Sequence, residues 1–151
     1  MYVGMTFPTE TADRLEIADV LARYAYAVDS GDWDRLDTVF TEDALIDYTS
    51  AGGIKGPRQE AKAWLADVLR HWPGRLHLIG AMTIRFEGDD GGEAVVTASF
   101  ADTLAPAREA IAADTSGLIQ GGGWYHHRMV RTPSGWRSRE LVEEQTWRTM
   151  R

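Results

Sequence analysis

The sequence contains no cysteine, and this absence removes several kinds of chemistry at once. Disulfide bonds, thiolate nucleophiles and metal sites with cysteine ligands are all excluded. Long apolar runs are missing too, since no stretch approaches the roughly 20 residues that a membrane-spanning helix needs. The first ten residues lack the basic and apolar regions of a signal peptide. We therefore expect a cytoplasmic protein.

Positive charge is scarce: 16 Lys and Arg stand against 23 Asp and Glu, giving a net charge of -7. No basic cluster interrupts this balance, which argues against nucleic acid and anionic membranes as partners. Aromatic residues are plentiful, and they can fill a core or line a pocket for a hydrophobic small molecule. The length suits a single domain over residues 1–151, with residues 1–10 expected to form a flexible N-terminal segment.

The first half of the chain has the periodicity of helices. Ile17, Leu21, Tyr24 and Val28 recur at three- and four-residue steps, which predicts a first helix with an apolar stripe. Ser30-Gly31-Asp32 ends this helix. A second helix is expected at residues 33–40, a strand at residues 44–48 and a third helix at residues 57–69.

The second half alternates with the period of strands. The expected strands cover residues 75–86, 93–104, 121–131 and 136–147. Residues 105–120 are rich in alanine and fit either a long loop or a short extra helix. Helices that come first and antiparallel strands that come last indicate an α+β fold. A strongly curved sheet that wraps the first helix would enclose a pocket.

Asp29 and His77 are the first candidates for chemistry. Asp29 follows the apolar stripe of the first helix, where a carboxylate faces the negative end of the helix dipole and needs a partner. His77 shares an otherwise apolar strand face with Ile79 and Ala81. The structural alternative is that Asp29 is an ordinary turn residue and that His77 is a hydrogen-bonded core residue. As a pair, the carboxylate would orient the imidazole as a general base.

The remaining candidates are weaker. Tyr24, Tyr48 and Asp102 lie on or near the apolar side of their elements, where a tyrosine is more often part of the core and Asp102 would need a partner if buried. Other residues are expected to line the pocket: Tyr125, Met129, Trp33, Trp64 and His127.

Metal and phosphate motifs are absent from the sequence. Neighbouring His126 and His127 point to opposite sides of a strand, and no 2-His-1-carboxylate spacing or Gly-rich phosphate loop occurs. We expect no metal and no cofactor. Gly121-Gly122-Gly123 opens a strand and favours a bulge that bends it.

Four segments together resemble the SnoaL-like branch of the nuclear transport factor 2-like superfamily over nearly the whole chain. They are residues 22–36 (ARYAYAVDSGDWDRL), Phe40 to Tyr48, His77-Leu-Ile-Gly80, and Tyr125 to Trp136. Within this branch the chain is most similar to scytalone dehydratase, bile-acid 7α-dehydratase and hexachlorocyclohexane dehydrochlorinase.

The resemblance implies an α+β cone with an Asp–His pair that removes a proton in an elimination. Asp29 and His77 fall on this pair, with the same separation of 48 residues. Tyr24 falls on a catalytic tyrosine of bile-acid dehydratase, and Tyr48 on a water-binding tyrosine of scytalone dehydratase. Asp102 lies near a further acid of bile-acid dehydratase. Val28 replaces a second water-binding tyrosine, which argues against scytalone itself as the substrate.

These observations favour a dehydratase-type lyase that acts on a hydrophobic, cyclic small molecule, with His77 as base, Asp29 as its orienting group and Tyr24 as a hydrogen-bond donor. An isomerase or a polyketide cyclase would use the same residues. A ligand-binding or assembly module without catalysis is the third alternative. Relatives assemble through the outer face of the sheet, so the resemblance implies a homodimer or homotrimer.

Overall fold

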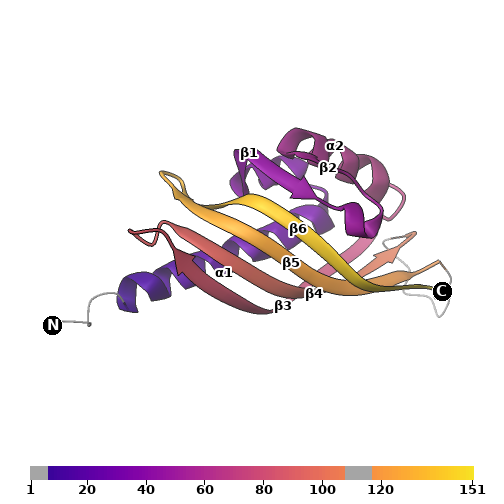
Figure 1. The fold of residues 1–151 in the computed structure, drawn as a ribbon. Helices are drawn as coiled ribbons and strands as arrows, with labels where there is room; N and C mark the ends of the chain where they lie inside the picture. The colour runs from indigo at the N-terminus through magenta and orange to yellow at the C-terminus, as the bar shows by residue number, and fades with distance from the viewer. Residues whose placement is uncertain (1–6, 108–116) are drawn as a thin grey trace.

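The computed structural model describes residues 7–107 and 117–151, in which helices precede a single sheet (Figure 1). The helical elements are α1 (Phe7–Ser30), η1 (Trp33–Thr38), η2 (Thr49–Ala51) and α2 (Arg58–Leu69). The strands are β1 (Phe40–Asp47), β2 (Lys55–Pro57), β3 (Gly74–Glu87), β4 (Glu93–Ala105), β5 (Ile119–Thr132) and β6 (Gly135–Met150).

The six strands form one open, curved sheet in the order β2-β1-β6-β5-β4-β3. Strands β3 to β6 are joined by antiparallel pairing, whereas β1 runs parallel to β6. Helix α1 lies along the inner side of this sheet, and α2 packs beside β1 (Figure 1). The predicted α+β fold, a mixed sheet curved around the N-terminal helix, is confirmed.

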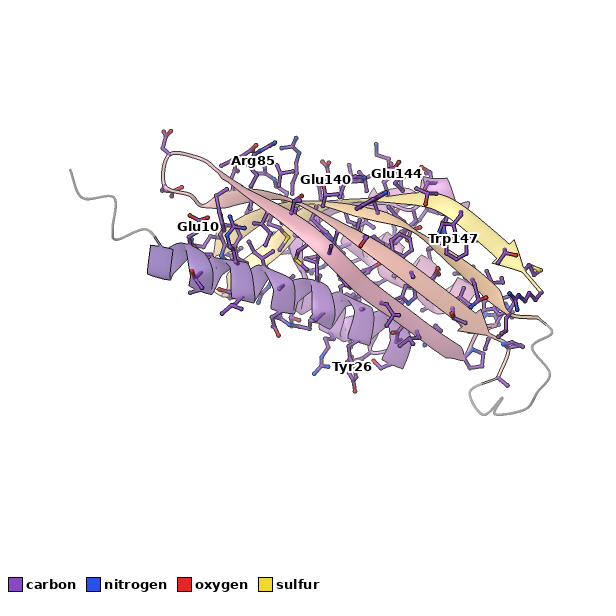
Figure 2. The ribbon with its side chains drawn as sticks, turned by 90° about the horizontal axis from the view of Figure 1, so that it is seen from below. Glu10, Tyr26, Arg85, Glu140, Glu144 and Trp147 are labelled. Atoms are coloured by element: carbon purple, nitrogen blue, oxygen red, sulfur yellow. The ribbon has the colours of Figure 1, made fainter. Side chains whose placement is uncertain are left out.

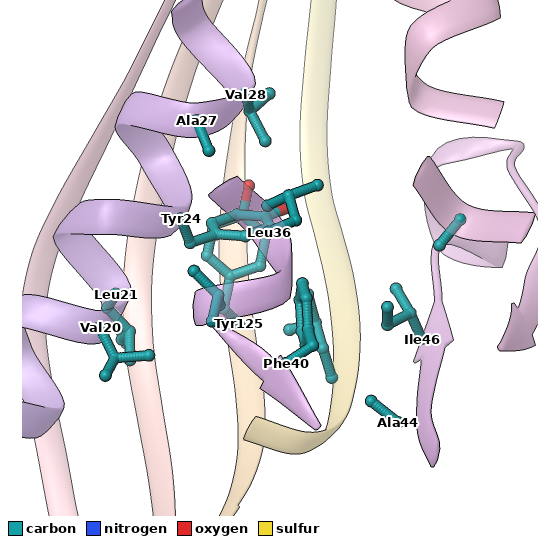
Figure 3. Close-up of a cluster of buried hydrophobic side chains, with 14 of the residues drawn as sticks. Val20, Leu21, Tyr24, Ala27, Val28, Leu36, Phe40, Ala44, Ile46 and Tyr125 are labelled. Atoms are coloured by element: carbon teal, nitrogen blue, oxygen red, sulfur yellow. The ribbon is translucent and has the colours of Figure 1, made fainter. Parts of the chain in front are cut away.

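The core lies between α1 and the inner face of the sheet (Figure 3). The predicted stripe of α1 is buried, with Ile17, Leu21, Tyr24 and Val28 at most 2% exposed. The Tyr24 ring meets Tyr125 edge-on, with ring centroids 5.3 Å apart. Burial of an aliphatic or aromatic side chain of this size contributes about 1.5–3 kcal/mol, so the stripe fixes which face of α1 turns inward.

The C-terminal end of α1 is set by Gly31, whose φ of 74° suits a residue without a Cβ. The next amide, of Asp32, donates to the carbonyl of Ala27 at 3.0 Å and closes the last turn. Asp29 is thereby held inside that turn, close to β3.

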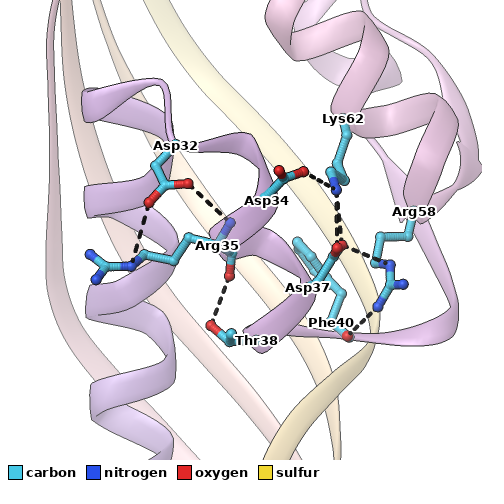
Figure 4. A network of polar contacts seen from close by, with 8 residues as sticks. All are labelled: Asp32, Asp34, Arg35, Asp37, Thr38, Phe40, Arg58 and Lys62. Atoms are coloured by element: carbon cyan, nitrogen blue, oxygen red, sulfur yellow. Dashed lines mark hydrogen bonds and ion pairs between the residues drawn. The ribbon is translucent and has the colours of Figure 1, made fainter.

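The connection after α1 is tied to α2 by charged side chains (Figure 4). Lys62 reaches Asp34 at 3.2 Å and Asp37 at 3.0 Å. The Arg58 guanidinium lies 3.2 Å from Asp37 and donates to the carbonyl of Phe40 at 3.1 Å. This network holds α2 over the end of the sheet at which the cavity described below lies.

The structure differs from the expected elements in several places. Residues 7–10, assigned to a flexible segment, form the first turn of α1, and residues 1–6 lie outside the described part. The second helix is a 3-10 helix, and the short strand β2 was not anticipated. Of the ambiguous segment 105–120, residues 108–116 lie outside the described residues. Among the described helices, none is long and apolar enough to cross a membrane.

Candidate active site

A cavity of about 190 Å³ lies between the end of α1, α2 and the inner face of the sheet. Its apolar lining is Val28, Trp64, Leu65, Val68, Leu69, Trp72, Leu104 and Ile119. Its polar lining is Tyr24, Tyr48, His77, Asp102, Glu143, Gln145 and Arg148. The predicted pocket residues Tyr24, Tyr48, Trp64, His77 and Asp102 therefore meet at one place.

Asp29 and His77 form a two-point contact between α1 and β3. Asp29 Oδ1 lies 2.6 Å from His77 Nδ1, and Asp29 Oδ2 accepts the backbone N–H of His77 at 2.8 Å. Because an ionised carboxylate only accepts hydrogen bonds, the ring proton sits on Nδ1 and the other nitrogen, Nε2, is left as a base. His77 lines the cavity, whereas Asp29 stands behind it as the orienting group.

Asp102 faces the free side of the same imidazole. Its Oδ2 lies 3.8 Å from His77 Nε2, and its Oδ1 is buried without a hydrogen-bond partner among the residues that the structure describes. Burial raises the pKa of this carboxyl, and the nearby His77 opposes that change. A Cβ on the facing residue Gly121 would stand 3.0 Å from Asp102 Oδ1, so the glycine leaves room for the carboxyl.

The hydroxyls of Tyr24 and Tyr48, which also line the cavity, lie 2.8 Å apart. Burial raises the pKa of both phenols well above 10, so both remain protonated. One hydroxyl donates to the other, which leaves one O–H free to donate to a ligand. Tyr48 is itself held by stacking on Trp64, with ring centroids 5.5 Å apart.

Glu143 and Arg148 also line the cavity, and the sequence analysis missed both. Burial raises the pKa of Glu143 to about 7, and Asp102 adds to this effect. Arg148 lies at the solvent edge, where it donates to the Ala51 carbonyl at 3.3 Å and to Gln145 at 3.2 Å. No signal in the sequence marks Glu143, because a bulge changes which face of β6 it occupies.

Four predicted pocket residues do not line this cavity. Tyr125 stacks on Phe100 in the core, with ring centroids 4.1 Å apart, and Met129 is fully buried. Trp33 lies under the Arg75 guanidinium, 5.6 Å from its ring centroid. Tyr125 and Met129 are thus part of the core, and the Trp33 ring is engaged by a cation.

His127 is the fourth, and it is a core residue. Its Nδ1 lies 2.9 Å from the Ser138 hydroxyl. Burial lowers the pKa of its imidazole to about 3, so the ring is neutral. Residues 7–107 and 117–151 contain no group of three or more His, Asp or Glu placed to hold a metal ion.

Sequence comparison identifies the family of the chain. Residues 9–142 match the model of the SnoaL-like domain family. The chain belongs to this family. An uncharacterized protein of Mycobacterium tuberculosis (strain ATCC 25618 / H37Rv) is 37% identical over 147 residues, which cover 97% of this chain and 95% of the relative.

Solved structures show the same SnoaL-like fold. A protein of Novosphingobium aromaticivorans described provisionally as a scytalone dehydratase has a TM-score of 0.80 at 18% identity, covering 96% of this chain and 91% of its own. A type 2 hexachlorocyclohexane dehydrochlorinase has a TM-score of 0.71 at 18% identity, covering 93% and 89%. At these identities the likeness concerns the fold.

Proposed function

We propose that this SnoaL-like protein is a lyase that eliminates water from a small, hydrophobic, cyclic carbonyl compound. The observation that carries the proposal is the Asp29–His77 contact, which leaves Nε2 of His77 as a free base at the wall of a largely apolar cavity. Among the structural neighbours, both a dehydratase-type and a dehydrochlorinase-type description name eliminations.

The cavity limits the size and polarity of the substrate. An apolar cavity of about 150 Å³ holds a benzene molecule, so a volume of about 190 Å³ suits a ligand of one or two rings. Trp64 and Trp72 offer flat apolar surfaces for those rings. The buried carboxyls of Asp102 and Glu143 disfavour an anionic substrate in the interior.

In the proposed reaction, His77 Nε2 removes a proton from the carbon next to the carbonyl. Asp29 stabilises the imidazolium that forms, because its carboxylate already bonds Nδ1. The free hydroxyl of the Tyr24–Tyr48 pair donates to the substrate carbonyl and stabilises the developing enolate. Asp102 lines the same cavity beside His77, with its Oδ2 3.8 Å from His77 Nε2.

Turnover of a bicyclic probe tests this function. Elimination of water from 3-hydroxy-1-tetralone gives 1-naphthol, which is followed by its fluorescence. We expect His77→Ala and Asp29→Asn to lower kcat by about 10²–10⁴-fold, the range of general-base catalysis. His126→Ala is the matched control, since that histidine contacts Glu144 rather than the cavity. A His77→Ala protein that works at the parent rate would exclude the mechanism.

An isomerase or cyclase would share the base and the tyrosine pair, and the mass of the product separates these reactions from a dehydration. A binding or assembly role is tested by the same variants, because it predicts no turnover by the parent protein. Assembly as a homodimer or homotrimer would use the outer face of the sheet, where large apolar side chains are exposed: Leu76, Leu78, Trp124 and Trp147. Trp147 is labelled in Figure 2.

A further inference from the structure

Glu143 is a carboxyl inside the cavity that the proposed mechanism does not use. It lies on the inner face of β6, where it pairs with Tyr125 of β5. The cavity wall holds Glu143 together with His77 and Asp102. Within the described residues it forms no salt bridge, and an ionised carboxylate that is buried without a cation at contact distance is costly. The position therefore favours a carboxylic acid over a carboxylate.

Charged and titratable groups face Glu143 from every neighbouring element. They are Tyr24 of α1, Tyr48 before η2, His77 of β3, Asp102 of β4, Tyr125 of β5 and Arg148 of β6. Asp102 acts against ionisation of Glu143, whereas Arg148 and a protonated His77 act in its favour. The buried phenols are neutral and can only share hydrogen bonds with it.

We propose that Glu143 is the general acid of this site and protonates a hydroxyl leaving group, so that the substrates are β-hydroxy carbonyl compounds rather than halides. This inference rests on the proposed function and adds to it a residue and a leaving group. Hydroxide is a poor leaving group and departs readily only as water, whereas a halide ion needs no proton. A protonated acid on the wall is therefore useful to a dehydratase and of no use to a dehydrochlorinase.

The elimination moves two protons and releases one molecule of water. His77 Nε2 takes the proton from the carbon next to the carbonyl, and the electron pair of that C–H bond becomes the C=C bond. The C–O bond breaks with its pair on oxygen, which receives the proton of Glu143 and leaves as water. The site then holds a His77 imidazolium and a Glu143 carboxylate. Transfer of the imidazolium proton to Glu143 through solvent restores the starting state.

The two proton transfers assist each other electrostatically. A positive charge on His77 lowers the pKa of Glu143, so the acid becomes stronger when the base has accepted its proton. After both transfers the site holds a positive His77 imidazolium and a negative Glu143 carboxylate, and these opposite charges attract each other. A base and an acid that line the same cavity are the arrangement that an elimination of water needs.

A carboxyl titration tests the acid without any substrate. The ¹³C resonance of the Glu143 side-chain carboxyl, identified by its loss in Glu143→Gln, is followed against pH. We expect its midpoint above about pH 6, well over the ordinary range of a glutamate. A midpoint at the ordinary value of 4.5 would overturn the proposal, because a carboxylate cannot donate a proton.

Two probes with different leaving groups test the role in turnover. Against 3-hydroxy-1-tetralone we expect Glu143→Gln to lower kcat by about 10²–10⁴-fold. Against 3-acetoxy-1-tetralone, whose acetate leaves without protonation, we expect a loss under about tenfold. Glu144→Gln is the matched control, because that neighbouring carboxylate lies on the outer side of β6 with Trp147 (Figure 2).

The outcomes separate the two proposals. If His77→Ala retains turnover, the proposed function fails. If His77→Ala is inactive on both probes while Glu143→Gln matches the parent on both, the lyase stands and the acid role of Glu143 fails. Equal large losses in Glu143→Gln on both probes also overturn the acid role, since they indicate a structural effect. If the parent acts on neither probe, the titration decides for or against the acid.

Discussion

The burial of Glu143 has a measurable effect on the pH dependence of stability. Its pKa rises from 4.5 to about 7 on folding. Between these two values the folded protein binds the Glu143 proton and the unfolded chain does not. Stability therefore falls as the pH rises through this window, which is the sign expected when the folded state holds more protons than the unfolded state.

The size of the effect follows from the same two values. Each pKa unit corresponds to about 1.4 kcal/mol, so the change from 4.5 to about 7 amounts to about 3 kcal/mol at a pH above 7. Glu143→Gln keeps the shape of the side chain and has no proton to lose. We expect it to match the parent near pH 4.5 and to exceed the parent by up to about 3 kcal/mol near pH 8.

Urea unfolding of both proteins across this pH range measures the difference directly. Other carboxyls, Asp102 among them, titrate in both proteins, so their direct contributions largely cancel in the comparison. Glu42→Gln, at an exposed position on β1, should show no such growth with pH. A stability difference between Glu143→Gln and the parent that stays constant from pH 4.5 to 8 would refute the reasoning.

Two further substitutions test other parts of the structure. Asp13 accepts hydrogen bonds from both terminal guanidinium nitrogens of Arg131 at 2.7 Å and from the Trp136 indole at 3.0 Å. In urea unfolding, Asp13→Asn should lower the free energy of unfolding by about 1.5–3 kcal/mol, whereas Asp19→Asn at an exposed position should lower it by under about 0.5 kcal/mol. An equally small loss in both variants would contradict this prediction. The Arg131 contact lowers the pKa of Asp13, so its contribution is present at neutral pH and is lost as the pH falls through that lowered pKa. Gly121→Val should push against Gln145 Nε2 and Asp102 Oδ1, displace these two lining groups and lower tetralone turnover by about 10-fold or more. Ala101→Val on the outer face should not lower it, and unchanged turnover in Gly121→Val would mean that the position of Asp102 does not matter for turnover.

The fold was predictable because the chain changes period in the middle. Three-and-four spacing through Val28 gave a buried helical stripe, and alternation from residue 75 onward gave the four long strands. These signals depend only on which face is buried. The Asp29–His77 contact was predictable in a weaker sense, since each residue alone fits a common structural role and only the family resemblance joined them.

The remaining features of the site could not be predicted, because irregular pairing in the strands breaks the strict alternation of the two faces. In β3 the register shifts between Ile79 and Met82, so Ala81 is exposed and does not share the inner face with His77 as predicted. In β6 the pairing jumps from Ser138 to Glu140, and the extra residue exchanges the two faces of the strand. Counting outward from the buried Trp136 therefore places Glu143 on the wrong side.

A second register shift in the same strand completes the site. Gly122 pairs with Trp147 and Gly123 with Gln145, so one residue of β6 is again unpaired. The triple glycine thus sits at a bulge, as the sequence favoured, and the bulge returns Arg148 to the inner face opposite Gly121. Without the first shift Glu143 would face solvent, and without the second Arg148 would.

The position of the cavity along α1 follows from side-chain size on β5. Toward the end of β5, His127 and Met129 fill the space under the helix and are buried. Toward the start, the inner-face positions of β5 are Gly121 and Gly123, which carry no side chain, and the cavity lies between α1, α2 and this end of the sheet. The carboxyls of Asp102 and Glu143 line this cavity. They cost stability because burial disfavours their charged forms and no Arg or Lys of residues 7–107 and 117–151 forms a salt bridge with them. A sequence selected for stability alone would place apolar side chains there, and their absence is the physical reason to assign chemistry to this end of the fold.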